Sequence, residues 1–272
     1  MSSEWTMVAG ALAPDISLLC ALDRISGYDP IGDAMTTSEP ALYDSLICLL
    51  NTGSASDADT HIKNELKTRV AELSQQLNIR HAHWAISCVA DPAAAHHRRE
   101  SVAGELPDVV AVFRIDSDQQ IYAIVEAFTN MTSTLTALRC REREVMSPDR
   151  IQSGRIDGSM QFCSFSRPAN QTHDEFMRIW WQEHTDVAIR TQSTFGYRQY
   201  EILEVVSGTF YADAIVEEHF PLEALSNPAV YFAAADASEL KAHLDEMMAS
   251  CDRFIDPDSI NVVHMTEYVN QE

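Results

Sequence analysis

Two adjacent glutamate–histidine pairs are the clearest candidates for proton transfer in this sequence. Glu183 and His184 form the first pair, and Glu218 and His219 form the second. An imidazole titrates near neutral pH, and a carboxyl group in apolar surroundings has a raised pKa, so both can serve as general acids or bases. We predict His184, Glu183 and His219 as catalytic residues and Glu218 as a substrate-binding residue. The alternatives are a structural histidine bonded to the backbone and a solvated strand end.

Tyrosines, a tryptophan and a further histidine complete the predicted site. Tyrosine hydroxyls can orient a phenol or carbonyl substrate through hydrogen bonds, and Tyr200 is predicted to assist catalysis. The other predicted substrate-binding residues are Trp180, Tyr197, Tyr211 and His264. The competing interpretation is that the tyrosines only pack and that His264, on an apolar strand face, is a satisfied core residue.

A metal site and several catalytic motifs lack support in the sequence. His81 and His83 place two imidazoles on one face of a predicted strand, but no third ligand is evident, so no metal is predicted. The segment His96–Arg99 is typical of a solvent-exposed loop. No Walker loop, G-x-G-x-x-G, G-x-S-x-G or H-E-x-x-H motif occurs, which argues against nucleotide-binding, serine hydrolase and zinc protease functions.

One stretch, residues 159–190, must position the first glutamate–histidine pair. A predicted strand over 160–165 ends at the break Arg167–Asn170. Thr172 and Glu175 then have the spacing of a capping box, which predicts a helix from Thr172 to Thr191. Its apolar stripe recurs at helical spacing and consists of Phe176, Trp180, His184 and Val187.

This stretch resembles the EthD family of dimeric α+β barrel proteins. The resemblance covers roughly Gly158 to Val269 and rests on Arg167, Asp174-Glu175-Phe176, Trp180-Trp181 and Glu183-His184. It implies a barrel in which single units usually pair, and a varied, mostly unassigned chemistry. Related barrels can bind haem through one histidine, so the resemblance also leaves His184 or His264 as a proximal ligand.

Strand and helix patterns recur along both halves of the chain. In the first half we predict strands over 43–50, 79–89 and 109–115, helices over 58–77 and 119–138, and an exposed polar excursion over 90–107. In the second half we predict strands over 160–165, 195–206, 210–219 and 260–269, with helices over 172–191 and 222–251. Alternation places Glu217 and His219 on one face of their strand and Glu218 on the other.

The predicted fold is α+β, with two tandem ferredoxin-like (βαββαβ) units forming an intramolecular dimeric α+β barrel. The predicted parts are an N-terminal arm (1–40), a degenerate ferredoxin-like half (41–150) and an EthD-like half (151–272). Both faces of the sheets look partly apolar, so the two sheets should face each other. We expect a hollow between them that His184 reaches. The Trp-Trp and Glu-His motif is missing from the first half, so one site is expected, in the second half.

Composition limits the partners and the compartment. The net charge of −22, from 41 acidic and 19 basic residues, disfavours nucleic acid and anionic lipid as partners. No apolar run is long enough to span a membrane, and the start of the chain lacks the basic region of a signal peptide. Six cysteines without a CxxC pair suit free thiols in a reducing cytoplasm. A homo-oligomer is possible.

The function expected from these features is that of a cofactor-independent lyase or isomerase. It would carry out dehydration, cyclisation or carbon–carbon lysis by acid–base catalysis on a small apolar, aromatic or polyketide-like substrate. Two alternatives remain at this point: a non-catalytic small-molecule-binding or accessory protein of a catabolic pathway, and a haem-dependent barrel enzyme.

Overall fold

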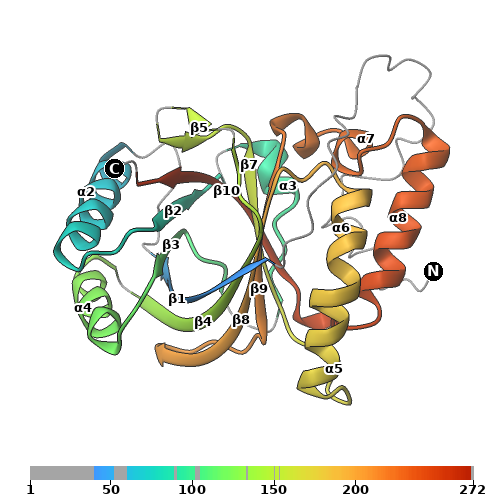
Figure 1. Ribbon diagram of the computed structural model, residues 1–272. Helices are drawn as coiled ribbons and strands as arrows, with labels where there is room; N and C mark the ends of the chain where they lie inside the picture. Colours follow the sequence, from blue (N-terminus) through green and yellow to red (C-terminus); the bar gives the residue numbers. More distant parts are fainter. Residues whose placement is uncertain are drawn as a thin grey trace.

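A closed antiparallel barrel of eight strands forms the centre of the molecule (Figure 1). The computed structural model describes residues 40–51, 60–88, 91–101, 105–132, 134–149, 151–152 and 154–270, so the predicted arm lies almost wholly outside the described residues. Around the barrel the strands follow the order β2-β3-β1-β4-β8-β9-β7-β10, and β10 pairs back with β2. The strands are β1 (Ala41–Asn51), β2 (Ala82–Ser87), β3 (Val109–Arg114), β4 (Thr134–Met146), β5 (Ile151–Gln152), β6 (Arg155–Ile156), β7 (Ser159–Phe165), β8 (Gly196–Ser207), β9 (Ala214–Phe220) and β10 (Asn261–Val269).

Helices cover the barrel on two opposite sides (Figure 1). The helices are α2 (Thr60–Gln76), α3 (Pro92–His96), α4 (Asp118–Thr129), α5 (His173–Arg178), the π-helix η2 (Ile179–His184), α6 (Thr185–Thr191), the 3₁₀ helix η3 (Leu222–Leu225), α7 (Pro228–Tyr231), α8 (Ala237–Cys251) and the 3₁₀ helix η4 (Pro257–Ser259). α2 and α4 lie on one side, and α5, α6 and α8 on the other. Within the described ranges, no helix has both the length and the apolar character that crossing a bilayer requires.

The two halves of the chain supply equal parts of the barrel. The first four barrel strands lie in the order β2-β3-β1-β4, and the last four lie in the matching order β8-β9-β7-β10. Two seams join the halves, one between β4 and β8 and one between β2 and β10. The prediction of an α+β barrel built within one chain is confirmed in this form.

Strand β4 corrects the prediction of a helix that continues to residue 138. α4 ends at Thr129, and the 13-residue strand β4 follows. Inside the barrel, Glu142 accepts hydrogen bonds from Ser45 and Arg114, and Glu144 accepts one from Arg114. Because both faces of β4 carry charged residues, its sequence lacks the apolar alternation that usually marks a strand.

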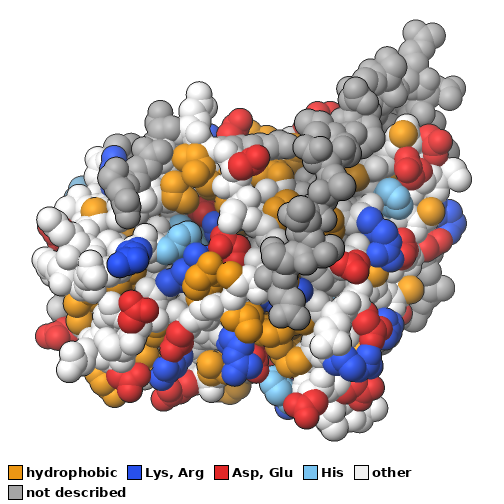
Figure 2. Space-filling view, in the orientation of Figure 1, with side chains coloured by type: hydrophobic (Ala, Val, Ile, Leu, Met, Phe, Trp, Pro, Cys, Tyr) orange, Lys and Arg blue, Asp and Glu red, His pale blue; other side chains and the backbone are white. Residues whose placement is uncertain are grey.

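The inside of the barrel is apolar at one end and charged at the other. Cross-strand packing fills the apolar part with side chains that include Ile47, Val112, Phe162, Ile215 and Val263. Two further cores lie outside the barrel, one under α2 and α4 and one under α5, α6 and α8. On the viewed surface, acidic and basic side chains are intermixed rather than gathered in one patch (Figure 2).

The predicted exposed excursion over 90–107 is confirmed for His96, Arg98 and Glu100, which are exposed, but is wrong for His97 and Arg99. Arg99 exchanges backbone hydrogen bonds with Val262 of β10, at 3.0 and 2.8 Å. His97 is buried, and its Nε2 lies 2.8 Å from the backbone oxygen of Leu225. The segment therefore pairs with the edge of β10 at Arg99, and its charged residues concealed this role in the sequence.

A π-helix interrupts the predicted helix over 172–191. The wider turn over Ile179–His184 leaves backbone carbonyls that need donors, and the Thr185 hydroxyl lies 3.2 and 3.1 Å from the carbonyl oxygens of Trp180 and Trp181. Arg143 of β4 donates to the same hydroxyl at 3.0 Å and to Gln199 at 2.7 Å. A residue of the first half therefore braces the helix that carries Trp180 and His184.

Candidate active site

The sheet separates the predicted catalytic residues into two groups. On β9, Glu217 and His219 point into the barrel, whereas Glu218 points outward under the helices. On β8, Tyr200 belongs to the barrel interior and Tyr197 to the outer core. The helices lie outside the barrel, so the expectation that His184 reaches the hollow between the sheets is wrong. His184 and His219 cannot act on one substrate.

A small enclosed cavity lies between the outer face of the second-half sheet and its helices. Its volume is about 40 Å³. Four of the predicted site residues line it, namely Trp180, His184, Tyr197 and Glu218. The other lining residues are Gln161, Cys163, Phe165, Gln192, Val216, Met247, Cys251, Phe254, Ile255 and Ile260.

Glu218 is a buried carboxyl group that forms no ion pair with any residue in the described part of the chain. Strand pairing places it between Gln161 of β7 and Tyr197 of β8. Its hydrogen bond with the Gln161 amide is long, at 3.4 Å. Burial raises the pKa of Glu218 from 4.5 to about 7, because loss of water disfavours the carboxylate. Glu218 therefore exchanges its proton near neutral pH.

His184 lines the same cavity, but its pKa is displaced in the opposite direction to that of Glu218. Burial lowers the pKa of His184 to about 3, and the positive charge of Arg253 adds to the effect. Its Nδ1 lies 2.9 Å from the Ser250 hydroxyl, and its ring packs on Phe254 with a centroid distance of 4.7 Å. The imidazole is therefore neutral at pH 7 and can accept a proton.

A chain of hydrogen bonds that sequence analysis missed extends from Glu218. Gln192 donates to the Tyr231 hydroxyl, which donates to Gln161, both at 3.2 Å. Gln161 then meets Glu218. Glutamines carry no distinctive sequence signal, and Tyr231 lies 70 residues from Gln161, so only the fold reveals this arrangement.

Five predicted site residues lie away from the cavity, and three of them, Glu183, Tyr211 and His264, also lie outside the barrel interior. Glu183 is on the surface, where it forms ion pairs with Arg178 and Arg253. Tyr211 is 70% exposed, because β9 begins at Ala214 rather than at residue 210. His264 lies on the outer face of β10.

Glu183→Gln should therefore leave turnover within about twofold of the wild-type rate, since exposed ion pairs contribute little. Steady-state kinetics of the purified variant, with any substrate the wild type converts, measure this. A loss of tenfold or more would mean that Glu183 takes part in the chemistry.

The barrel interior holds the other predicted catalytic residues in a dense charged cluster. Arg198 makes a two-pronged contact with Glu267 at 3.0 and 3.1 Å and a further contact with Glu217 at 3.0 Å. His219 Nε2 lies 2.6 Å from Glu267, and the Tyr200 hydroxyl donates to Glu217 at 2.8 Å. All five side chains are buried.

Opposite charges keep both carboxylates of this cluster ionised despite their burial. Burial alone would raise the pKa of Glu217, but His83 and Arg198 reverse that effect and lower it. The pKa of Glu267 lies well below its ordinary value for the same reason, with Arg198 and His219 as its main partners. Tyr200 and His219 are thus bound into an ion-pair network and do not face the cavity.

Haem, the alternative cofactor, does not fit the two histidines considered for it. His184 faces a cavity of about 40 Å³, which has room for a few water molecules and not for a porphyrin. His264 Nδ1 lies 2.9 Å from the Ser159 hydroxyl. Its ring packs against His97 with a centroid distance of 5.1 Å. The His264 residue is 2% exposed, so among the described residues neither histidine has the open space that an axial haem ligand needs.

Comparison with known proteins supports the fold and goes no further. No protein-family model matches the sequence, and no curated protein matches it. A structure described as an anthrone oxidase-like protein superposes with a TM-score of 0.50 at 9% identity, covering 85% of this chain and 94% of its own. A chlorite dismutase-like protein gives 0.42 at 14% identity over 84% and 94%. A dye-decolorizing protein from V. cholerae gives 0.38 at 13% identity over 85% and 94%.

Of these three structures, the first alone reaches a TM-score of 0.50. The likeness to the first of them shows that this chain has the same kind of fold. At 9% identity it carries no information on the reaction.

Proposed function

We propose that this protein is a cofactor-independent enzyme of the lyase or isomerase type, with its active site in the cavity between the second-half sheet and its helices. Glu218 would act as the acid and His184 as the base. The observation that carries the proposal is the opposite displacement of their two pKa values, to about 7 and about 3. Between these values the carboxyl group keeps its proton and the imidazole is free to take one, which suits acid–base catalysis.

In a dehydration, His184 and Glu218 would act on the same substrate molecule in one elimination step. His184 removes a proton from carbon, the electrons of that C–H bond form a double bond, and the carbon–oxygen bond breaks as Glu218 protonates the leaving hydroxyl. An imidazole with a low pKa is a weak base. The substrate should therefore carry an acidic hydrogen, such as a phenolic O–H or a C–H next to a carbonyl group.

The cavity wall favours a small, mainly apolar substrate of aromatic or polyketide-like type. Trp180, Phe165 and Phe254 supply flat apolar surface, and Tyr197 supplies a hydroxyl. The closed volume of about 40 Å³ is far below that of a typical ligand site. Entry of a substrate therefore requires the covering helices to move outward.

Three finer points belong to the same proposal. The matching strand orders of the two halves support tandem ferredoxin-like units, and the Trp180–His184 motif supports kinship with the EthD family. Cys48, Cys140, Cys163 and Cys251 are buried free thiols, which supports a cytoplasmic location.

Deuterium exchange tests the proposal without a known substrate. In D₂O, the wild-type protein should catalyse exchange of acidic C–H hydrogens for deuterium in some members of a panel of small ketones, hydroxyketones and phenols. Mass spectrometry detects the incorporated deuterium. His184→Gln should slow this exchange about 100-fold, because the amide cannot serve as a base. Absorption near the Soret region would reveal haem in the purified protein.

The exchange rate should also depend on pH, falling below about pH 3 as His184 becomes protonated and above about pH 7 as Glu218 ionises. If the wild-type protein binds panel compounds but exchanges their hydrogens no faster than His184→Gln does, it is a non-catalytic binding protein rather than an enzyme. A rate that is flat between pH 5 and 9 would remove Glu218 from the proposed role.

A further inference from the structure

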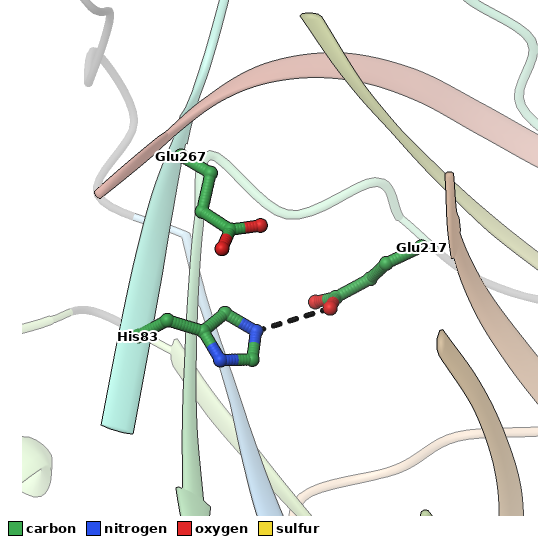
Figure 3. A group of neighbouring side chains, drawn as sticks. All are labelled: His83, Glu217 and Glu267. Atoms are coloured by element: carbon green, nitrogen blue, oxygen red, sulfur yellow. Dashed lines mark hydrogen bonds and ion pairs between the residues drawn. The ribbon is translucent and has the colours of Figure 1, made fainter. Parts of the chain in front are cut away.

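Four side chains that can bind metal ions meet inside the barrel, away from the cavity. His83 of β2, Glu217 of β9 and Glu267 of β10 each offer one ligand atom, and these atoms lie within 4.8 Å of one another (Figure 3). His219 joins them through Glu267 at 2.6 Å. All four are buried. Sequence analysis found only His83 with its neighbour His81, because the further donors come from the other half of the chain.

The guanidinium of Arg198 lies at the centre of this group. Its Nη1 is 3.0 Å from Glu217, 3.0 Å from Glu267 and 3.3 Å from His83 Nε2. A single positively charged nitrogen thus touches all three donors. This is the position that a bound cation would take.

The cluster has more electron-pair donors than Arg198 uses. Tyr200, Arg198 and His83 all converge on one oxygen of Glu217. The second oxygen, Glu217 Oε1, is buried and has no hydrogen-bond partner among the described residues. A buried carboxylate oxygen without a partner is costly. A cation would satisfy this oxygen.

We propose that His83, Glu217 and Glu267 bind a divalent first-row transition metal ion such as Zn²⁺ inside the barrel, with His219 holding Glu267 in place through its hydrogen bond. Mixed imidazole and carboxylate ligands suit such ions better than Mg²⁺ or Ca²⁺. Arg198 makes room by turning toward Glu144, whose Oε1 lies 3.9 Å from Arg198 Nε. Arg198 Nε is itself buried without a hydrogen-bond partner in the described part of the chain.

The position of the site defines what the ion does. β2 belongs to the first half and pairs with β10 of the second. A metal ion held by His83 and Glu267 therefore joins the two halves across this seam, on the opposite face of the sheet from the cavity. The ion binds only the folded chain, so it stabilises the closed barrel.

The wild-type protein provides the first test. After EDTA treatment and dialysis, added Zn²⁺ should bind with one ion per chain by elemental analysis. It should raise Tm by about 5–10 °C at a hundredfold excess over Kd. Co²⁺ should give visible absorption bands of a low-symmetry site. No retained zinc, no Co²⁺ spectrum and an unchanged Tm would overturn the proposal.

Variants separate a metal site from a purely structural ion-pair network. Glu217→Gln with Glu267→Gln should abolish Zn²⁺ binding. His264 is a buried histidine on the opposite face of β10. The control variant His264→Gln should leave Zn²⁺ binding unchanged. Arg198→Met removes the competing cation and should tighten Zn²⁺ binding at least tenfold. If Arg198→Met folds, as judged by circular dichroism, and still binds no Zn²⁺, the site is an arginine-filled network and the proposal is wrong.

Discussion

Glu218→Gln should abolish the proposed acid catalysis and make the folded protein more stable above neutral pH. A glutamine keeps the size and hydrogen-bonding capacity of the carboxyl group but cannot donate its proton, so the rate of exchange or turnover should fall by about 10²–10⁴-fold. The same change removes a buried group that would otherwise ionise. Activity and stability should therefore move in opposite directions.

The effect on stability follows from the pKa of Glu218, which burial raises from 4.5 to about 7. Below pH 4.5 the carboxyl group is protonated in both the folded and the unfolded chain. Between pH 4.5 and 7 the unfolded chain loses this proton while the folded chain retains it, so the free energy of unfolding falls as pH rises. The loss amounts to about 3 kcal/mol at pH 8.

Urea denaturation of wild type and Glu218→Gln at pH 5 and pH 8 measures the difference. The two proteins should have similar stability at pH 5, and the variant should be more stable at pH 8. Glu183→Gln serves as the activity control, because Glu183 lies on the surface. Parallel stability curves for wild type and Glu218→Gln would show that Glu218 ionises normally in the folded state.

Arg198→Met should be among the most destabilising single substitutions in this protein when metal is absent. It leaves Glu217 and Glu267 facing each other in the barrel interior without the guanidinium that now contacts both. Removal of one partner from a buried ion-pair network costs about 3–5 kcal/mol. Urea denaturation in EDTA should show this loss.

Arg190→Met is the matched control for Arg198→Met. Arg190 forms an ion pair with Glu246 in which both side chains are largely exposed, so its loss should cost no more than about 1 kcal/mol. If Arg198→Met cost as little as Arg190→Met, the charged cluster would not contribute to folding. Zn²⁺ should restore part of the stability of Arg198→Met if the metal site exists.

Local patterns in the sequence predicted several features that the structure contains. Strict alternation along β9 placed Glu217 and His219 on one face and Glu218 on the other, because the side-chain period of a strand is two residues. The predicted cap at Thr172 is present in its first half: the Thr172 hydroxyl accepts a hydrogen bond from the Glu175 amide at 3.3 Å. Features of this kind depend on residues close together in the chain.

Features that depend on distant residues could not be predicted in the same way. Glu217 meets His83 across 134 residues, and Arg198 meets Glu267 across 69. The charges of β4 concealed a strand because their partners lie on other strands of the barrel. The sequence also gave no sign of which side of the sheet would carry His184, so residues from opposite faces were assigned to one site.

Through Arg143, the first half of the chain supports the site in the second half, although the first half lacks a catalytic motif of its own. Arg143 crosses the β4–β8 seam to hold Thr185 and Gln199, and Gln199 in turn donates to the Tyr197 hydroxyl at the cavity. Substitutions in the first half are therefore constrained, because a change at Arg143 would alter the cavity lining although Arg143 itself does not line the cavity. Selection for the function of the second half should therefore preserve Arg143, even though Arg143 belongs to the first half, across the β4–β8 seam.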